Sequence, residues 1–155
     1  MKTMTERTIV AFVCLHGSAK SLVAAEHMNR LAYARGVPLS ATTSGPEPDA
    51  EVPSNVIEGL LRRGIDARHR VPQQVGAQAL AQARHIVSFS CDLEDLVGAQ
   101  RGVERWDDCP AVSDDFDIAW AFITERVEQL FDRLSKGQPA PVETSVRPVS
   151  PKSES

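Results

Sequence analysis

A cysteine that follows a short apolar run is the first residue whose type and position suggest chemistry. Residues 8–13 (Thr-Ile-Val-Ala-Phe-Val) are apolar or β-branched, and they lead directly to Cys14. An uninterrupted run of this kind is typical of a strand buried on both faces of a parallel sheet. A Gly-containing turn at residues 16–18 follows, and a helical pattern begins near Ala19. Cys14 is therefore expected in the crevice at the strand ends where open α/β sheets hold their ligands.

The turn after Cys14 has the properties of an anion-binding site. The first amides of a helix have no partners within it, and the helix dipole gives them partial positive charge. A loop around such a terminus binds anions, and Lys20 adds a full charge. A thiolate is stabilised there and acts as a nucleophile. The pattern predicts attack of the Cys14 sulfur on phosphate or arsenate; in the alternative, Cys14 is a small buried residue that closes the strand.

Composition sets the broad class of protein. The chain has 155 residues, 42% hydrophobic and 25% charged, which suits one globular domain. A net charge of −4 without a basic stripe argues against nucleic-acid binding. No apolar run is long enough to span a bilayer, and the N-terminus lacks a signal-peptide core, so we expect a cytoplasmic protein without a membrane partner. Three widely spaced cysteines and scattered histidines predict no metal site, and we expect no cofactor.

Strands and helices are expected to alternate along the chain. Further strands are expected at residues 39–43, 85–90 and, as a short edge strand, 103–106. Helices are expected at residues 19–35, 53–63, 72–83 and from 113 to about 136, with Ser18 and Ser113 as N-caps. Residues 93–103 are expected to be irregular or to form at most one helical turn. This order predicts a single three-layer α/β domain over residues 1–137, with a four-stranded parallel sheet and helices on both faces. Four prolines and few large apolar residues predict a disordered tail at 138–155.

Several reactive groups are expected to meet at one edge of this sheet. The carboxyl ends of parallel strands share an edge, so the loops that follow them converge there. The residues brought together in this way are Cys14 with residues 15–19, Ser44, Cys91, Asp107 and Asp108.

The pattern Cys14-x5-Lys20-Ser21 resembles that of the low-molecular-weight protein tyrosine phosphatase superfamily. Thioredoxin-coupled arsenate reductases share its fold, and the similarity covers most of residues 8–134. An Asp-containing loop at 106–111 before the last helix is similar to the family's general-acid loop. Residues 43–48 and 64–66 fall where the family has similar turns.

The resemblance implies a phosphotyrosine phosphatase I-like fold and a role for each matching residue. Cys14 would be the nucleophile, and Ser21 would hydrogen-bond its thiolate. Asp108, or alternatively Asp107, would protonate the leaving oxygen and later activate water. The oxyanion would be bound by the loop amides, which belong to Leu15, His16, Gly17, Ser18, Ala19 and Lys20. The His16 ring is either a substrate contact or an exposed turn side chain.

The chain departs from the family pattern at two positions. The family has Arg where this chain has Lys20, and a planar guanidinium binds two oxygens whereas an ammonium offers one compact charge. The family's Asp-Pro pair is Cys109-Pro110 here, with Asp108 one place earlier. The first departure predicts weak phosphatase turnover, and the second leaves the choice between Asp107 and Asp108 open.

Three functions follow from these residues. The first is hydrolysis of phosphomonoesters, including phosphotyrosine in a phosphoprotein substrate. The second is a thiol-dependent arsenate reductase with a reductant such as thioredoxin, in which Cys91 and Cys109 resolve the adduct; in the alternative, both cysteines are inert. The third is a catalytically impaired domain that binds an oxyanion without turnover.

Overall fold

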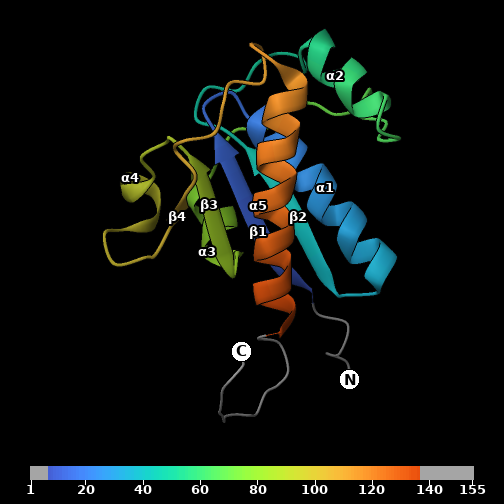
Figure 1. The fold of residues 1–155 in the computed structure, drawn as a ribbon. Helices are drawn as coiled ribbons and strands as arrows, with labels where there is room; N and C mark the ends of the chain where they lie inside the picture. Colours follow the sequence, from blue (N-terminus) through green and yellow to red (C-terminus); the bar gives the residue numbers. More distant parts are fainter. Residues whose placement is uncertain (1–6, 137–155) are drawn as a thin grey trace.

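The computed structural model, which describes residues 7–136, is built on a parallel sheet (Figure 1). Its four strands are β1 (Thr8–Cys14), β2 (Leu39–Ser44), β3 (His85–Phe89) and β4 (Glu104–Arg105). They lie in the order β2-β1-β3-β4, and every neighbouring pair is parallel. The expected α/β class and four-stranded parallel sheet are confirmed. Because the register pairs Cys14 with Phe89, the ends of the two central strands lie at one edge of the sheet.

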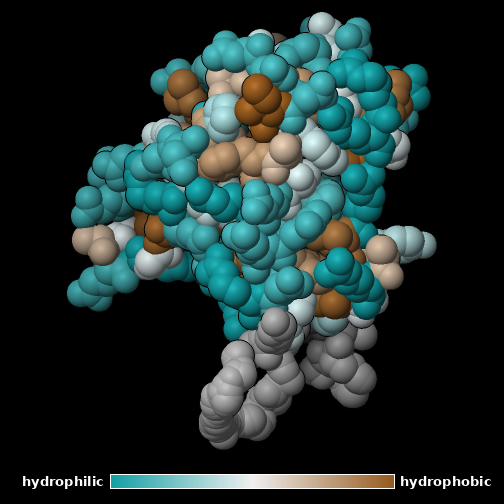
Figure 2. Space-filling view, viewed as in Figure 1, coloured by the Kyte–Doolittle hydropathy of each residue, from teal (hydrophilic) through white to brown (hydrophobic). Residues whose placement is uncertain are grey.

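Helices cover both faces of the sheet (Figure 1). They are α1 (Lys20–Arg35), α2 (Ser54–Leu61), α3 (Ala77–Gln82), α4 (Glu94–Val97) and α5 (Phe116–Lys136). Successive residues of β1 point to opposite faces: Val10 and Phe12 pack with α1, α2 and α5, while Ala11 and Val13 pack with α3 and α4. This double burial explains why β1 is apolar throughout. The face of the molecule that carries α5 is mainly hydrophilic, with a few separate hydrophobic patches (Figure 2).

Three local expectations need correction. The helix expected at 72–83 is limited to α3, because the backbone before it pairs with Gly45 instead: Gly45 N donates to Gln73 O and Val75 N donates to Gly45 O, both at 3.0 Å. Ser18 does not cap α1; its hydroxyl is bonded to Asp49. Ser113 does not cap α5, because this helix begins only at Phe116. Asp115 takes the capping role instead, since its carboxylate accepts the Ile118 amide at 3.2 Å.

The other expected elements agree with the structure to within a few residues. The irregular stretch 93–103 contains one helical turn, α4, and the edge strand is the two-residue β4. No helix among residues 7–136 is long and apolar enough to cross a bilayer. The expected tail at 138–155 and the domain boundary at 137 lie outside the described residues.

Glu104 of β4 joins the edge of the sheet to α5. Its carboxylate accepts hydrogen bonds from His85 Nε2 at 2.7 Å, Trp106 Nε1 at 2.8 Å and Arg133 Nη2 at 3.0 Å. The bond to His85 is the main cause that lowers the pKa of Glu104 to about 2, with further lowering by Trp106 and Arg133 and a partial opposing effect of burial.

This low pKa predicts a loss of stability in acid that depends on Glu104. The carboxylate stabilises the fold fully above its ordinary pKa of 4.5, and this contribution is lost as the pH falls toward about 2. We expect Glu104→Gln to be less stable than wild type by on the order of 2 kcal/mol at pH 7 and to lose less stability between pH 5 and pH 2.5. Urea unfolding at both pH values measures this, with the exposed Glu125→Gln as control. Equal acid sensitivity of wild type and Glu104→Gln would contradict the assignment.

Candidate active site

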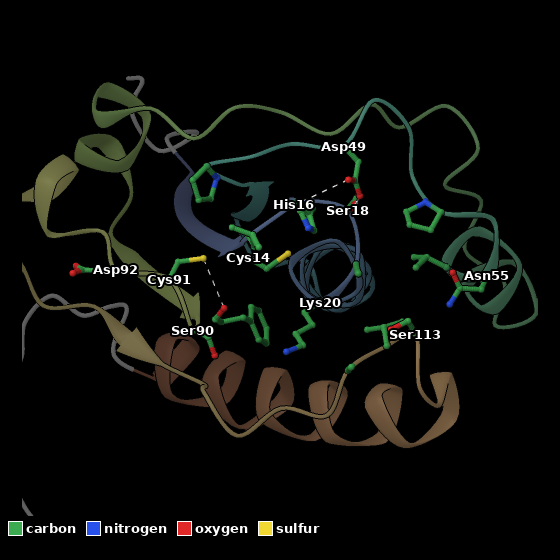
Figure 3. A pocket seen from close by; sticks show the side chains of 18 residues that line it. Cys14, His16, Ser18, Lys20, Asp49, Asn55, Ser90, Cys91, Asp92 and Ser113 are labelled. Carbon is green, nitrogen blue, oxygen red and sulfur yellow. Dashed lines mark hydrogen bonds and ion pairs between the residues drawn. The ribbon is translucent and has the colours of Figure 1, made fainter.

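A pocket of about 610 Å³ opens at the carboxyl edge of the sheet (Figure 3). It is lined by the end of β1 and the loop into α1, by parts of residues 46–56, by the end of β3 and the residues that follow it (89–92), and by residues 111–113 before α5. Four connections that are far apart in the sequence therefore meet where the topology predicts a ligand site.

Cys14 lies at the inner end of this pocket. The residue is 6% exposed, yet it is among those that line the cavity. Its Sγ lies 3.0 Å from Ser21 Oγ and accepts the Ser21 amide at 3.4 Å. Ser21 Oγ is in turn 2.6 Å from Thr43 Oγ1. Thr43 Oγ1 also lies 3.4 Å from the Gly17 carbonyl oxygen, so this chain of hydroxyl groups links the Cys14 sulfur to the loop and to β2.

The loop between β1 and α1 offers unpaired main-chain donors. Gly17 N donates to Cys14 O at 3.2 Å and so closes the turn. Within residues 7–136, five neighbouring amides donate to no protein acceptor; they belong to Leu15, His16, Ser18, Ala19 and Lys20. Such donors at the start of a 16-residue helix, next to the Cys14 sulfur, can bind and polarise a tetrahedral oxyanion.

Lys20 supplies a formal positive charge to the same pocket. The ion pairs within the described part of the chain do not involve its ammonium group. Its charge can therefore act on a ligand held by the loop. His16 also lines the pocket, and half of its side chain is exposed.

The end of β2 packs against this loop, backbone to backbone. Gly17 has φ +61°, and a Cβ added to it would lie 2.8 Å from the Ser44 carbonyl carbon. A Cβ on Gly45 would overlap the Cys14 carbonyl oxygen and lie 2.6 Å from both Gly17 N and Leu15 O. Glycine is required at both positions because the approach leaves no room for a side chain.

Asp49, in the segment after Gly45, was not among the residues expected at the site. It lines the pocket and accepts the Ser18 hydroxyl at 2.6 Å. Its position in the sequence could have indicated this role, because a polar residue shortly after the end of a parallel strand lies at the edge of the sheet where ligands bind.

The two aspartates of the expected acid loop do not line the pocket. Asp107 accepts the Ser90 amide at 3.0 Å and the Arg105 guanidinium at 2.9 Å. Asp108 pairs with Arg126 of α5 at 3.0 Å. The expectation that both carboxylates converge on Cys14 is therefore wrong for this conformation, because neighbouring donors hold them elsewhere. Ser44 is likewise outside the lining, although its backbone touches the loop.

Cys91 lines the same pocket as Cys14 (Figure 3). Its position is fixed through its backbone, since Ser88 Oγ bonds its N at 2.9 Å and its O at 2.7 Å. Ser90 before it adopts φ +70°, a costly conformation for a residue other than glycine. Burial is the main cause that raises the pKa of the Cys91 thiol, and the nearby Cys14 raises it further. Cys91 is therefore a neutral thiol at pH 7.

Cys109 is buried outside the pocket lining. Burial raises the pKa of its thiol to about 11, and the charge of Lys20 opposes this rise. Cys109 is also a neutral thiol at pH 7. Its role and that of Cys91 stay predictions.

The fold, the cysteine and the loop define a class of protein, a phosphatase-like α/β domain with a cysteine at the start of a loop of unpaired amides. The family model described as low molecular weight phosphotyrosine protein phosphatase matches residues 9–106. The chain belongs to this family. Among curated proteins, no sequence match was found.

Solved structures share the fold at low sequence identity. YfkJ from Bacillus subtilis is 22% identical with a TM-score of 0.76, and the match covers 86% of this chain and 98% of YfkJ. A thioredoxin-dependent arsenate reductase from Corynebacterium glutamicum is 17% identical with a TM-score of 0.70, covering 88% of this chain and 66% of the reductase. A low molecular weight protein tyrosine phosphatase from Streptococcus pyogenes is 15% identical with a TM-score of 0.70, covering 82% and 93%.

The close approach of Gly45 to the loop predicts a selective effect of adding one methyl group. We expect Gly45→Ala to push the loop out of its curve, to lower stability by about 1–3 kcal/mol and to weaken phosphate binding by about tenfold or more. Thermal unfolding and calorimetry with inorganic phosphate measure the two effects. Gly76→Ala is the control, because a Cβ there meets nothing within 4 Å. Phosphate affinity in Gly45→Ala equal to that in Gly76→Ala would refute the packing argument.

Proposed function

We propose that this chain is a cysteine phosphatase that hydrolyses phosphomonoesters through a cysteinyl-phosphate intermediate. The observation that carries the proposal is the position of Cys14 Sγ, which accepts the Ser21 amide, lies 3.0 Å from the Ser21 hydroxyl and sits in a pocket beside five unpaired loop amides. Family membership supports the same cysteine-based chemistry.

The proposed reaction has two steps. The Cys14 thiolate attacks phosphorus, an S–P bond forms, and the P–O bond to the leaving alcohol breaks while that oxygen takes a proton. Water then attacks phosphorus, the S–P bond breaks, and the thiolate returns with release of phosphate. The loop amides and Lys20 stabilise the negative charge on the phosphoryl oxygens in both steps, and Ser21 stabilises the departing thiolate.

Asp108 is the proposed proton donor, by its match to the family's acid loop. Its carboxylate is bound to Arg126 at 3.0 Å, so proton transfer requires this surface ion pair to open and the loop to turn toward the pocket. An exposed pair of this kind is weak, at about 0–1 kcal/mol, and does not prevent the movement. Asp107 is the less suitable donor because it holds both the Ser90 amide and Arg105.

An aryl phosphate, as in phosphotyrosine of a protein, is the proposed substrate class. The Streptococcus pyogenes protein is named as a tyrosine phosphatase, and Wzb from Vibrio vulnificus has been solved in complex with benzylphosphonate. In this chain Phe89, Val56 and Val112 line the pocket, and they offer apolar contact to a ring.

The mechanism predicts opposite effects of two substitutions. Cys14→Ser removes the nucleophile and is expected to lower kcat for p-nitrophenyl phosphate by on the order of 10³-fold or more, with phosphate binding retained. Lys20→Arg supplies a planar guanidinium to two phosphoryl oxygens and is expected to raise kcat/KM by about tenfold. Steady-state kinetics measure both. Unchanged turnover in Cys14→Ser would overturn the mechanism; phosphate binding without turnover in wild type would favour the impaired domain.

A second candidate function is thiol-dependent arsenate reduction. This candidate is supported by the positions of the three cysteines. Cys14 and Cys91 line one pocket, and Cys109 lies close enough to interact electrostatically with Cys14. The Cys14 thiolate would displace water from arsenate to form an S–As bond. Attack of a second thiol on the Cys14 sulfur would then break that bond, release arsenite and leave a disulfide, which a thiol reductant such as thioredoxin reduces. The Corynebacterium glutamicum relative is named as such an enzyme.

Separate substitutions of the two other cysteines test this candidate. If reduction is intramolecular, arsenate-dependent oxidation of reduced thioredoxin is expected to fall by on the order of 10²-fold in Cys91→Ser or Cys109→Ser, while aryl phosphate turnover stays within about twofold. A coupled assay of reductant consumption measures the loss. Full activity in both variants would remove the resolving-cysteine mechanism.

A further inference from the structure

We propose that Asp49 is a positioning residue, which holds the loop at residues 15–18 in the curve that binds an oxyanion. Its carboxylate acts through Ser18 and His16 and does not itself contact the anion. The inference rests on the proposed function, because it concerns the loop to which that function assigns the phosphate.

The strongest contact of Asp49 is with Ser18. Ser18 is 1% exposed, and its hydroxyl donates to Asp49 Oδ2 at 2.6 Å. A bond to an ionised acceptor at this distance is about twice as strong as a neutral one. Because the hydroxyl proton is committed to Asp49, the Ser18 amide is the group left to face a ligand. Figure 3 shows the Asp49 carboxylate above the loop, reaching toward Ser18 and His16.

A second set of contacts fastens the same segment to the loop. Asp49 Oδ1 lies 3.6 Å from His16 Nδ1, and this nitrogen lies 2.8 Å from the Glu47 carbonyl oxygen. Since both neighbours of Nδ1 are acceptors, this nitrogen carries the proton. Along the backbone, Asp49 N donates to His16 O at 3.2 Å and Glu47 N donates to Leu15 O at 2.9 Å. The segment after β2 is thus bonded to three residues of the loop, Leu15, His16 and Ser18.

The loop needs such support because its donors are unsatisfied. When several amides in one short turn have no acceptor, the curved backbone is less stable than conformations in which these amides are hydrogen-bonded. A carboxylate beside a bound dianion is repelled by it, so direct ligand binding does not explain Asp49. Its contacts with Ser18 and His16 explain it, because they favour the curved loop before the ligand arrives.

This role predicts a particular kinetic pattern. If Asp49→Ala leaves only a tenth of the molecules with a competent loop, the apparent Kd for phosphate rises about tenfold, and a bound substrate still restores the loop. We therefore expect KM for an aryl phosphate to rise by about tenfold with kcat within about twofold of wild type. A proton-donating role would instead lower kcat and change the pH profile of kcat.

The experiment uses the full chain and inorganic phosphate as the probe. Calorimetric Kd, KM and kcat are measured for wild type, Asp49→Ala, Asp49→Asn and Ser18→Ala, and for the double variant of Asp49→Ala with Ser18→Ala. Asn keeps an oxygen that accepts the Ser18 hydroxyl and is expected to restore the affinity to within about threefold of wild type. Glu51→Ala is the matched control, since Glu51 is an exposed acid two residues away. Thermal unfolding of every variant identifies any that fail to fold.

Agreement requires a weaker Kd in Asp49→Ala and Ser18→Ala, no further loss in the double variant, and an unchanged Kd in Glu51→Ala. A Kd in Asp49→Ala equal to or better than that of wild type, a Kd in Asp49→Asn as weak as that of Asp49→Ala, or a loss of kcat alone overturns the positioning role even where turnover supports the proposed function. If wild type binds phosphate without turning over any phosphoester, the proposed function fails and the Kd series still decides the role of Asp49. Absence of phosphate binding in wild type overturns the inference directly.

Discussion

The site depends on the backbone contact between the loop after β1 and the end of β2. A Cβ on Gly17 would collide with the main chain at the end of β2, and a Cβ on Gly45 would collide with the main chain of the loop after β1. This contact fixes the loop relative to the sheet, and the segment that begins at Gly45 then bonds to Leu15 and His16. Because the loop is fastened from outside, its amides remain unpaired on the side where an anion can bind.

Three cysteines near one site have different surroundings, and this separates their chemistry. The Cys14 sulfur accepts the Ser21 amide and lies 3.0 Å from the Ser21 hydroxyl, whereas burial keeps Cys91 and Cys109 as neutral thiols at pH 7. A thiolate attacks an oxyanion, and a neutral thiol does so poorly. The arrangement is therefore consistent with one nucleophile and, in a reductase, with thiols that act only after an adduct has formed.

Much of the fold and part of the site could be predicted because they depend on local patterns. A continuous apolar run identified β1, and the parallel topology that follows from alternating strands and helices brought Cys14 and Cys91 to one pocket. The acid loop could not be predicted in the same way. Asp107 and Asp108 follow a strand end as expected, but the Ser90 amide and Arg126, distant in sequence, decide where their carboxylates lie.

The sequence by itself determined the class of fold and the place of Cys14 and the turn after it at the carboxyl edge of the sheet, and it predicted an anion-binding role for that turn. These follow from hydrophobic periodicity and from the unpaired amides of any helix start. Tertiary structure alone decided which polar groups support that turn. Asp49 reaches Ser18, and Thr43 reaches Ser21, only because β2 lies beside β1 in register. Such contacts join residues 22 to 31 positions apart, and no local pattern encodes a distance of that kind.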